Sequence, residues 1–184
     1  MKTSVGKSRL SQAANPNQET YSPPNAVFPD TEPVFTIGIA SQLTNTSVHA
    51  LRVYEEKKLI LPFVTPTHRR LYSQFDIERI KCIRRHLDEE GLNIAGIKAL
   101  LAMIPCWLLR PCSPEDQAAC EAFTSTTAPC WEVGKKGPEC QDTTCRDCQV
   151  YRMGYRCGDI KSFCKAAYSG MIQISTSETS GGAE

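Results

Sequence analysis

The stretch SVHALRVYEEKKLILPFVTPTHRRLYS, residues 47–73, decides the fold class. Ser47 opens it as a good helix N-cap, because its hydroxyl can accept a free backbone N–H of the first turn. The apolar Val48 and Leu51 share one face of the predicted helix, which runs to about Lys57. The other face is polar, so we expect this helix to be buried along one edge and free along the other.

A small β-hairpin is predicted directly after this helix. Two short apolar segments, residues 59–62 and 70–72, lie on either side of the polar, proline-containing segment 65–68. Short apolar runs separated by a polar turn are typical of two paired strands. The hairpin would form a wing beside the helix.

A shorter helix is predicted before the quoted stretch, over residues 38–44. Its apolar Ile39, Ala40 and Leu43 are expected to face inward. The polar turn 44–46 then joins it to the helix that Ser47 caps.

Two further helices are predicted after the hairpin. Ser73 and Asp76 have the spacing of a capping box, and the residues that follow carry isoleucine or leucine every three or four positions. Gly91 ends this third helix, Asn93 caps a fourth, and Pro105 stops it. A mainly α fold follows.

Two short helices joined by a tight turn and followed by a hairpin form a winged helix-turn-helix. A helix of this width fits the major groove of B-DNA, where base edges can be told apart. Wing side chains are placed to meet phosphates or the neighbouring groove. The candidate DNA-contacting residues are Ser47, His49 and Arg52 on the helix and His68, Arg69 and Arg70 in the wing.

The formal charge of the 184-residue chain is only +1, but the charge is unevenly distributed. Residues 35–110 carry eleven basic and seven acidic side chains, whereas residues 111–184 carry seven basic and ten acidic ones. A basic segment beside an acidic, cysteine-rich one is typical of a polyanion-binding domain joined to something else.

Four regions are predicted from composition. Residues 1–34 form a disordered arm, 35–104 the winged helix-turn-helix domain, 105–168 a small, cysteine-rich and loop-rich module, and 169–184 a disordered tail. No stretch approaches the roughly 20 apolar residues of a membrane-spanning helix, and the N-terminus lacks the apolar run of a signal peptide. We therefore expect a cytoplasmic protein whose thiols stay reduced.

The domain over residues 35–104 also resembles a known family. Four segments stand in the order and spacing of the MerR family of bacterial transcription regulators: Phe35–Gly38, Leu51–Glu55, Arg69–Ser73 and Gly91–Ile97. The last segment is most similar to the heat-shock repressor branch. Where the family usually has two aromatics after the arginine, this chain has Val53 first, and Pro105 interrupts the usual long dimerisation helix.

The resemblance implies a function and a set of DNA contacts. It implies a homodimer in the bacterial cytoplasm that binds double-stranded promoter DNA in the nucleoid and acts there on RNA polymerase. Arg52 and Tyr54 would hold phosphates, and wing residues would contact or support the DNA. The implied set adds Gly38, Tyr54 and Tyr72 to the helix and wing residues named above.

Nine of the ten cysteines follow residue 105, and seven of them form a degenerate repeat. Each copy starts Pro-Cys-Trp, has a later pair of cysteines eight positions apart, and ends with an aromatic residue three positions after the last cysteine. This pattern resembles the small two-CW modules of bacterial proteins, which implies a metal or cluster site. The candidate ligands are Cys106, Cys112 and Cys120 in the first copy and Cys130, Cys140, Cys145 and Cys148 in the second.

A segment this short, with few aliphatic residues, needs staples or a metal to fold. Thiolates suit zinc and iron–sulfur clusters, and the spacing Cys140-x4-Cys145-x2-Cys148 matches that of plant-type [2Fe–2S] proteins. We favour an iron–sulfur cluster, with zinc and disulfides or free thiols as alternatives. Cys82 stands alone and is interpreted as a small apolar residue. No acid–base pair or nucleophile–histidine set indicates an enzyme.

Overall fold

The computed structural model describes residues 30–110, 112–141 and 143–153. The predictions of a disordered arm over most of residues 1–34 and of a disordered tail lie outside these residues, as do Cys157 and Cys164. Within them, no helix is both long enough and apolar enough to cross a membrane.

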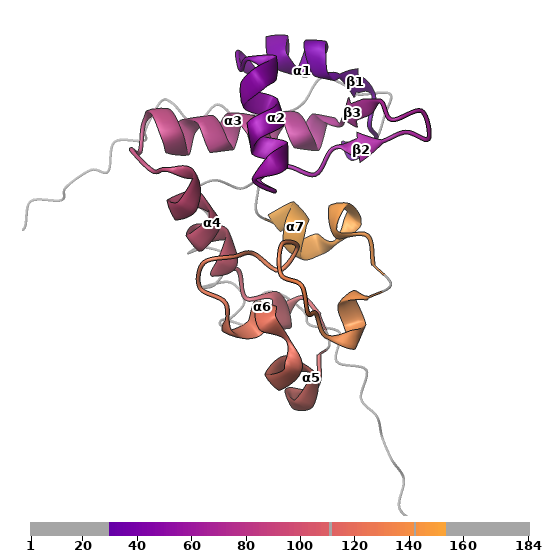
Figure 1. Cartoon of the computed structure of the whole chain (residues 1–184), viewed down its shortest axis with the longest axis vertical. Helices are drawn as coiled ribbons and strands as arrows, with labels where there is room; N and C mark the ends of the chain where they lie inside the picture. Colours follow the sequence, from indigo (N-terminus) through magenta and orange to yellow (C-terminus); the bar gives the residue numbers. More distant parts are fainter. Residues whose placement is uncertain (1–29, 111, 142, 154–184) are drawn as a thin grey trace, which may run out of the picture.

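The first part of the chain forms four helices and a small antiparallel sheet with the strand order β1-β3-β2 (Figure 1). Phe35 of β1 lies opposite Tyr72, and Phe63 of β2 lies opposite Leu71, so β3 is the central strand. The elements are β1 (Phe35–Thr36), α1 (Ile37–Thr44), α2 (Val48–Glu56), β2 (Phe63–Val64), β3 (Arg70–Tyr72), α3 (Gln74–Asp88) and α4 (Ile94–Ala102).

The helices begin where the capping signals of the sequence predict. The Ser47 hydroxyl accepts the Ala50 N–H at 3.1 Å at the start of α2. Ser73 and Asp76 form a complete capping box at the start of α3, and the Asn93 side chain caps α4. The predicted mainly helical fold with a small sheet is confirmed.

One core joins the helices to the sheet and continues into the cysteine-rich region. Its fully buried members include Leu51 of α2 and the isoleucines of α3 and α4, and Trp131 and Tyr151 of the cysteine-rich region belong to the same cluster. The winged domain and the cysteine-rich module therefore share apolar packing.

The predicted first strand of the hairpin was wrong. The strand is Phe63–Val64, whereas Leu59 and Ile60 are fully buried in a loop. The core, including the cysteine-rich module, covers these two residues. Their apolar character therefore reflects burial in this core and not a place in a strand. Strand β1 was missed, since its two residues carry no periodic signal.

The inward faces of α1 and α2 were only partly predicted. Ala40 is buried, but Ile39 and Leu43 are more than 40% exposed, and Val48 is also exposed. The buried positions of α1 are Ala40 and Thr44, one turn apart. The small Ala40 side chain, not the larger apolar ones beside it, faces the core.

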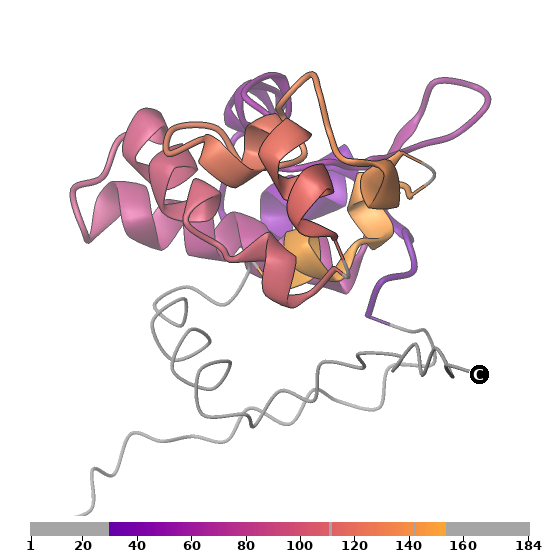
Figure 2. The ribbon, with the colours of Figure 1, turned by 90° about the horizontal axis from the view of Figure 1, so that it is seen from below.

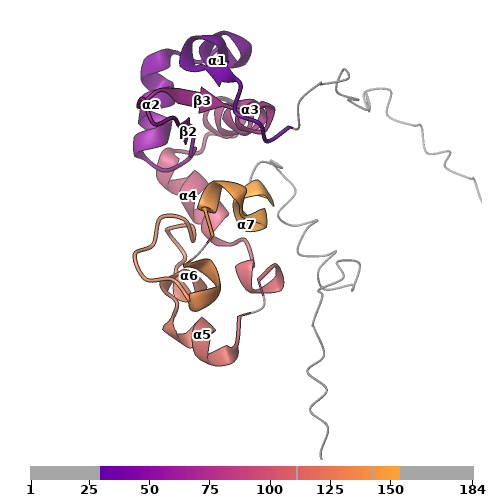
Figure 3. The same cartoon turned by 90° about the vertical axis from the view of Figure 1, so that its right-hand side faces the viewer.

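The cysteine-rich region consists of short helical turns joined by loops. It lies next to the winged domain, with α7 close to α3 and α5 at the far end (Figures 1 and 3). Seen from below, the β2–β3 hairpin projects beyond it (Figure 2). Its elements are η1 (Cys106–Leu108), α5 (Pro114–Ala119), α6 (Glu121–Thr124), η2 (Pro138–Cys140), η3 (Cys145–Asp147) and α7 (Gln149–Met153).

Candidate DNA-binding face and cysteine cluster

Helix α2 and the hairpin expose most of the predicted DNA-contacting side chains. The exposed residues are Gly38 in α1, Ser47 at the N-cap of α2, His49 and Arg52 in α2, and His68, Arg69 and Arg70 in the wing. None of these positions is taken up by the core, so all remain available to a ligand.

The tip of the wing is a tight turn held by Thr65. Its backbone N–H donates to the Arg69 carbonyl, and its hydroxyl accepts the Arg69 N–H at 3.0 Å. His68 has a φ of 59°, in the left-handed region that closes the turn. This geometry fixes the backbone that carries His68 and Arg69.

An ion pair joins α2 to the wing. Arg70 Nε lies 2.6 Å from a carboxylate oxygen of Glu55. The hydrogen bond to Glu55 and its charge raise the pKa of Arg70 above its ordinary value. Helix α2 and the wing are therefore joined by an ion pair between their charged side chains.

The two predicted tyrosines are buried, unlike the arginines near them. Tyr54 is 7% exposed and Tyr72 is fully buried. Burial, with the nearby Glu55 carboxylate, raises the pKa of Tyr72 to about 12. Among the described residues its hydroxyl has no hydrogen-bond partner. These side chains support α2 and β3 from the inside.

The seven cysteines of the two repeats are free thiols that come together in one cluster. Burial, together with the neighbouring thiols Cys120, Cys112 and Cys140, raises the pKa of Cys106 to about 11. Burial also raises the pKa of Cys130, with contributions from Cys106 and three thiols of its own repeat. The cluster therefore spans both repeats, and at neutral pH its most buried members are protonated.

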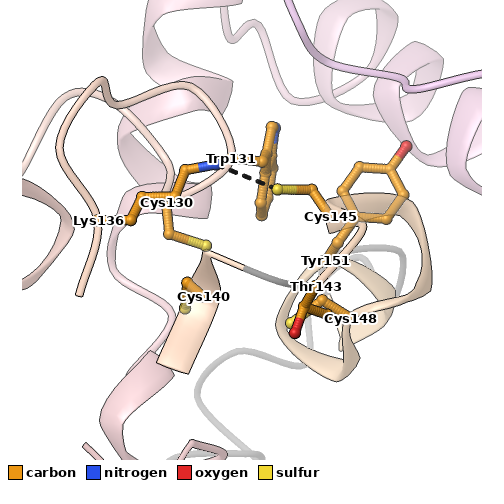
Figure 4. A pocket seen from close by; sticks show the side chains of 8 residues that line it. All are labelled: Cys130, Trp131, Lys136, Cys140, Thr143, Cys145, Cys148 and Tyr151. Atoms are coloured by element: carbon orange, nitrogen blue, oxygen red, sulfur yellow. Dashed lines mark hydrogen bonds between the residues drawn. The ribbon is translucent and has the colours of Figure 1, made fainter. Parts of the chain in front are cut away.

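Four thiols of the second repeat line a small cavity beside Trp131 and Tyr151 (Figure 4). The Lys136 ammonium donates to Cys145 Sγ at 3.2 Å across its rim. The cavity encloses only about 20 Å³, which is room for one water. The four thiols are those of Cys130, Cys140, Cys145 and Cys148.

The donor set of this cluster suits a soft metal. Within residues 30–110, 112–141 and 143–153, no group of three or more Cys, His, Asp or Glu side chains is arranged to hold a metal ion. Binding a metal or a cluster by these thiols alone would require them to move.

Cys82 differs from the seven cysteines of the repeats. It lies half-buried on α3 and is disulfide-bonded. The interpretation of Cys82 as a plain apolar residue is thereby corrected. A lone cysteine within a helix gives no local signal of its pairing.

Arg79 of α3 is the central residue that sequence reasoning missed. It is 1% exposed, and its guanidinium lies 4.1 Å from the centre of the Tyr151 ring and 5.1 Å from that of Trp131. It donates to the carbonyls of Leu59 at 2.6 Å and Tyr151 at 3.0 Å. Burial lowers the pKa of Arg79, and the charges of Tyr151, Asp76 and Cys130 oppose part of that shift.

A second arginine, Arg146 of η3, completes the docking. It donates to both carboxylate oxygens of Asp76, at 3.1 and 2.7 Å, and to the Leu61 carbonyl at 2.6 Å. Asp76 is fully buried. The sequence held one clue to this contact, because Asp76 and Arg79 share a helix face with the buried Ile80 and Ile83.

The fold and its exposed basic face define a winged helix-turn-helix domain. Residues 35–104 match the family model of MerR HTH family regulatory proteins. The chain therefore carries a MerR-family helix-turn-helix domain, as the sequence motifs predict.

Curated relatives match over segments of similar length. The chain is 45% identical over 71 residues to the HTH-type transcriptional regulator GlnR of Bacillus anthracis, covering 39% of this chain and 54% of that protein. It is 35% identical over 71 residues to the heat shock protein HspR of Streptomyces coelicolor, covering 39% of this chain and 47% of that protein. It is 44% identical over 64 residues to the HTH-type transcriptional regulator TnrA of Bacillus subtilis, covering 35% of this chain and 57% of that protein.

The chain spans about half the length of the curated relatives it matches. HspR is among them, but GlnR and TnrA match at higher identity, so the comparisons do not single out the heat-shock branch. GlnR and TnrA are named as transcriptional regulators, which is not an enzymatic function, in line with the expectation that the chain is not an enzyme.

Proposed function

We propose that the protein is a sequence-specific DNA-binding transcriptional regulator of the MerR type. The carrying observation is the exposed polar face of α2 beside an ordered wing, within a domain that matches this family. Arg52 and His49 face outward from a helix that suits the major groove, and Arg69 lies at the tip of the wing.

Substitution of Arg52 tests this function. A duplex is first selected from a random library by the wild-type chain, and binding is then titrated at several salt concentrations. Arg52→Ala should weaken binding about tenfold and reduce the slope of log affinity against log salt by about one, because one phosphate contact is lost.

The matched control is Arg152→Ala, a partly exposed arginine on α7 that pairs with Asp147. It should leave both the affinity and the salt slope unchanged. Equal effects of the two substitutions would overturn the assignment of α2 to DNA.

The rest of the proposal follows the family resemblance. The regulator would act as a homodimer on promoter DNA, in contact with RNA polymerase, in the bacterial cytoplasm. The dimer would need a geometry of its own, because α4 ends at Ala102 and Pro105 lies in the loop after it.

The cysteine module is proposed to sense redox state or a metal. Seven free thiols meet in one cluster, and they are the soft donors that iron–sulfur clusters and zinc use. We favour an iron–sulfur cluster, because of the Cys140-x4-Cys145-x2-Cys148 spacing. A cluster bound there would supply a group whose charge changes on oxidation.

The alternative is a structural zinc staple for dimerisation or partner binding, without sensing. It is favoured by the extensive docking of the module on the winged domain. Anaerobic purification, a visible spectrum and analysis of iron, sulfide and zinc separate the two. A coloured protein that bleaches in air supports sensing, whereas tight zinc and redox-insensitive DNA binding support the staple.

A further inference from the structure

The side chains that dock the cysteine module are covalently next to its thiols. Each docking residue follows a cysteine of the second repeat directly or within one helical turn. The pairs are Cys130 with Trp131, Cys145 with Arg146, and Cys148 with Tyr151. Because such neighbours share one short piece of backbone, a shift of these cysteines also moves the docking side chains.

Metal binding or oxidation would change the positions of the thiols in this cluster. Its cavity holds about 20 Å³, and among the described residues no group of three thiols is arranged around a metal position. A disulfide would require two of the free sulfurs to approach to about 2.05 Å. A shift of the backbone that carries these sulfurs is the step that amide exchange in the docked loop measures.

The docking side chains hold the loop that joins α2 to β2. The Trp131 indole N–H donates to the Lys58 carbonyl at 2.8 Å. The Tyr151 hydroxyl accepts the Leu61 N–H at 2.8 Å, and Arg146 donates to the Leu61 carbonyl. Much of the hydrogen bonding of this loop therefore comes from the module.

This loop connects the two parts of the proposed DNA-binding face. Lys57 caps the end of α2, and β2 begins at Phe63. A displacement of the loop changes the position of the wing relative to α2. Arg79 lies at its centre, because the same guanidinium contacts the loop carbonyl of Leu59 and both aromatic rings of the module.

We propose that Trp131 and Tyr151, through their hydrogen bonds to Lys58 and Leu61 and their packing on Arg79, transmit the state of the cysteine cluster to the loop 58–61 and so set the position of the wing relative to α2. Trp131 and Tyr151 are thus positioning residues that act on DNA recognition through this loop. The inference deepens the proposed function and rests on it for the DNA readout, but the loop readout stands without DNA.

The test compares the reduced, metal-free, full-length chain with two treated forms. One receives Zn²⁺, and the other is oxidised by a diazenedicarboxamide. In the oxidation, each new S–S bond releases two protons and two electrons, which convert the N=N bond of the oxidant to a hydrazine. Amide hydrogen exchange is measured over residues 58–64, and affinity is measured for the selected duplex.

The test variant is Trp131→Phe combined with Tyr151→Phe. It keeps two aromatic rings but removes the indole donor to Lys58 and the hydroxyl acceptor for Leu61. The control is Trp107→Phe, the corresponding change in the first repeat. In the wild type and the control, at least one treatment should change loop exchange and DNA affinity by about tenfold. In the double variant, both responses should fall below about twofold.

Two results would overturn the proposal. One is wild-type loop exchange that stays the same under both treatments. The other is a double variant that responds as strongly as the wild type. If the loop responds as expected but no duplex is bound, the coupling stands and the proposed DNA-binding function fails, so the two failures are distinguishable.

Discussion

The two Cys-Trp repeats build the same pair of aromatic rings in different surroundings. In the first repeat Trp107 and Phe123 meet edge to face with ring centroids 5.1 Å apart. In the second repeat Trp131 and Tyr151 also meet edge to face at 5.1 Å. The first pair is 38% and 39% exposed, whereas the second is 7% and 1% exposed.

The difference in exposure comes from what each aromatic pair packs against and not from the repeat itself. Arg79 lies against the second pair, and the α2–β2 loop supplies backbone groups for its indole and hydroxyl. Among the described residues, no cation lies over the rings of the first pair. The repeat thus provides a general aromatic clamp, and only the copy that meets α3 uses it to join the module to the winged domain.

Truncation of the two tryptophans should give the largest difference in stability between the two repeats. Trp131→Ala removes a buried ring, its contact with Arg79 and a hydrogen bond, and it should lower the free energy of unfolding by about 3–5 kcal/mol. Trp107→Ala removes a partly exposed ring and should cost about 1 kcal/mol. Chemical denaturation of both full-length variants measures the difference. Equal losses would mean that the docking contributes little to stability.

The guanidinium of Arg146 is the next feature that distinguishes the second repeat from the first. The corresponding position of the first repeat, two residues before its last cysteine, is Ala118. Arg146→Ala therefore makes the repeats more alike, and it leaves the fully buried Asp76 carboxylate without its ion-pair partner. Because the loss of one partner leaves a buried charge uncompensated, we expect a cost of about 3 kcal/mol.

The control for this change is Arg152→Ala in the same module. Its ion pair with Asp147 is exposed at both ends. Exposed pairs contribute less than about 1 kcal/mol, so thermal or chemical unfolding of this variant should match the wild type closely. A loss as large as that of Arg146→Ala would assign the effect to the module alone and not to its contact with α3.

The local signals of the winged domain were sufficient to predict its helices. Ser47, Ser73 and Asn93 act within one turn of their own helices, so the sequence pattern and the structure agree there. The apolar segment 59–62 was interpreted as a strand, because its apolar character has a distant cause. Leu59 and Ile60 are buried by a core to which residues about 90 positions away contribute.

The candidate site shows the same limit. The exposed basic residues of α2 and the wing were predicted, because exposure on a helix face follows from periodicity. The spacing of the Cys-Trp repeats was also visible. The burial of Arg79 against Trp131 and Tyr151 was not predicted. An arginine on a helix is ordinarily solvated, and the aromatic partners of this one are supplied by another part of the chain.

The smallest expected effect comes from the single oxygen atom by which Tyr151 differs from Phe123. Tyr151→Phe gives the second repeat the ring of the first and leaves the partly buried Leu61 N–H without its acceptor, which should cost about 1 kcal/mol. Phe123→Tyr makes the reverse change on an exposed ring and should alter stability by less than about 0.5 kcal/mol. Unfolding curves and Leu61 amide exchange measure both. If Tyr151→Phe leaves Leu61 exchange unchanged, the hydroxyl does not hold the loop, and the contrast between the repeats reduces to ring burial alone.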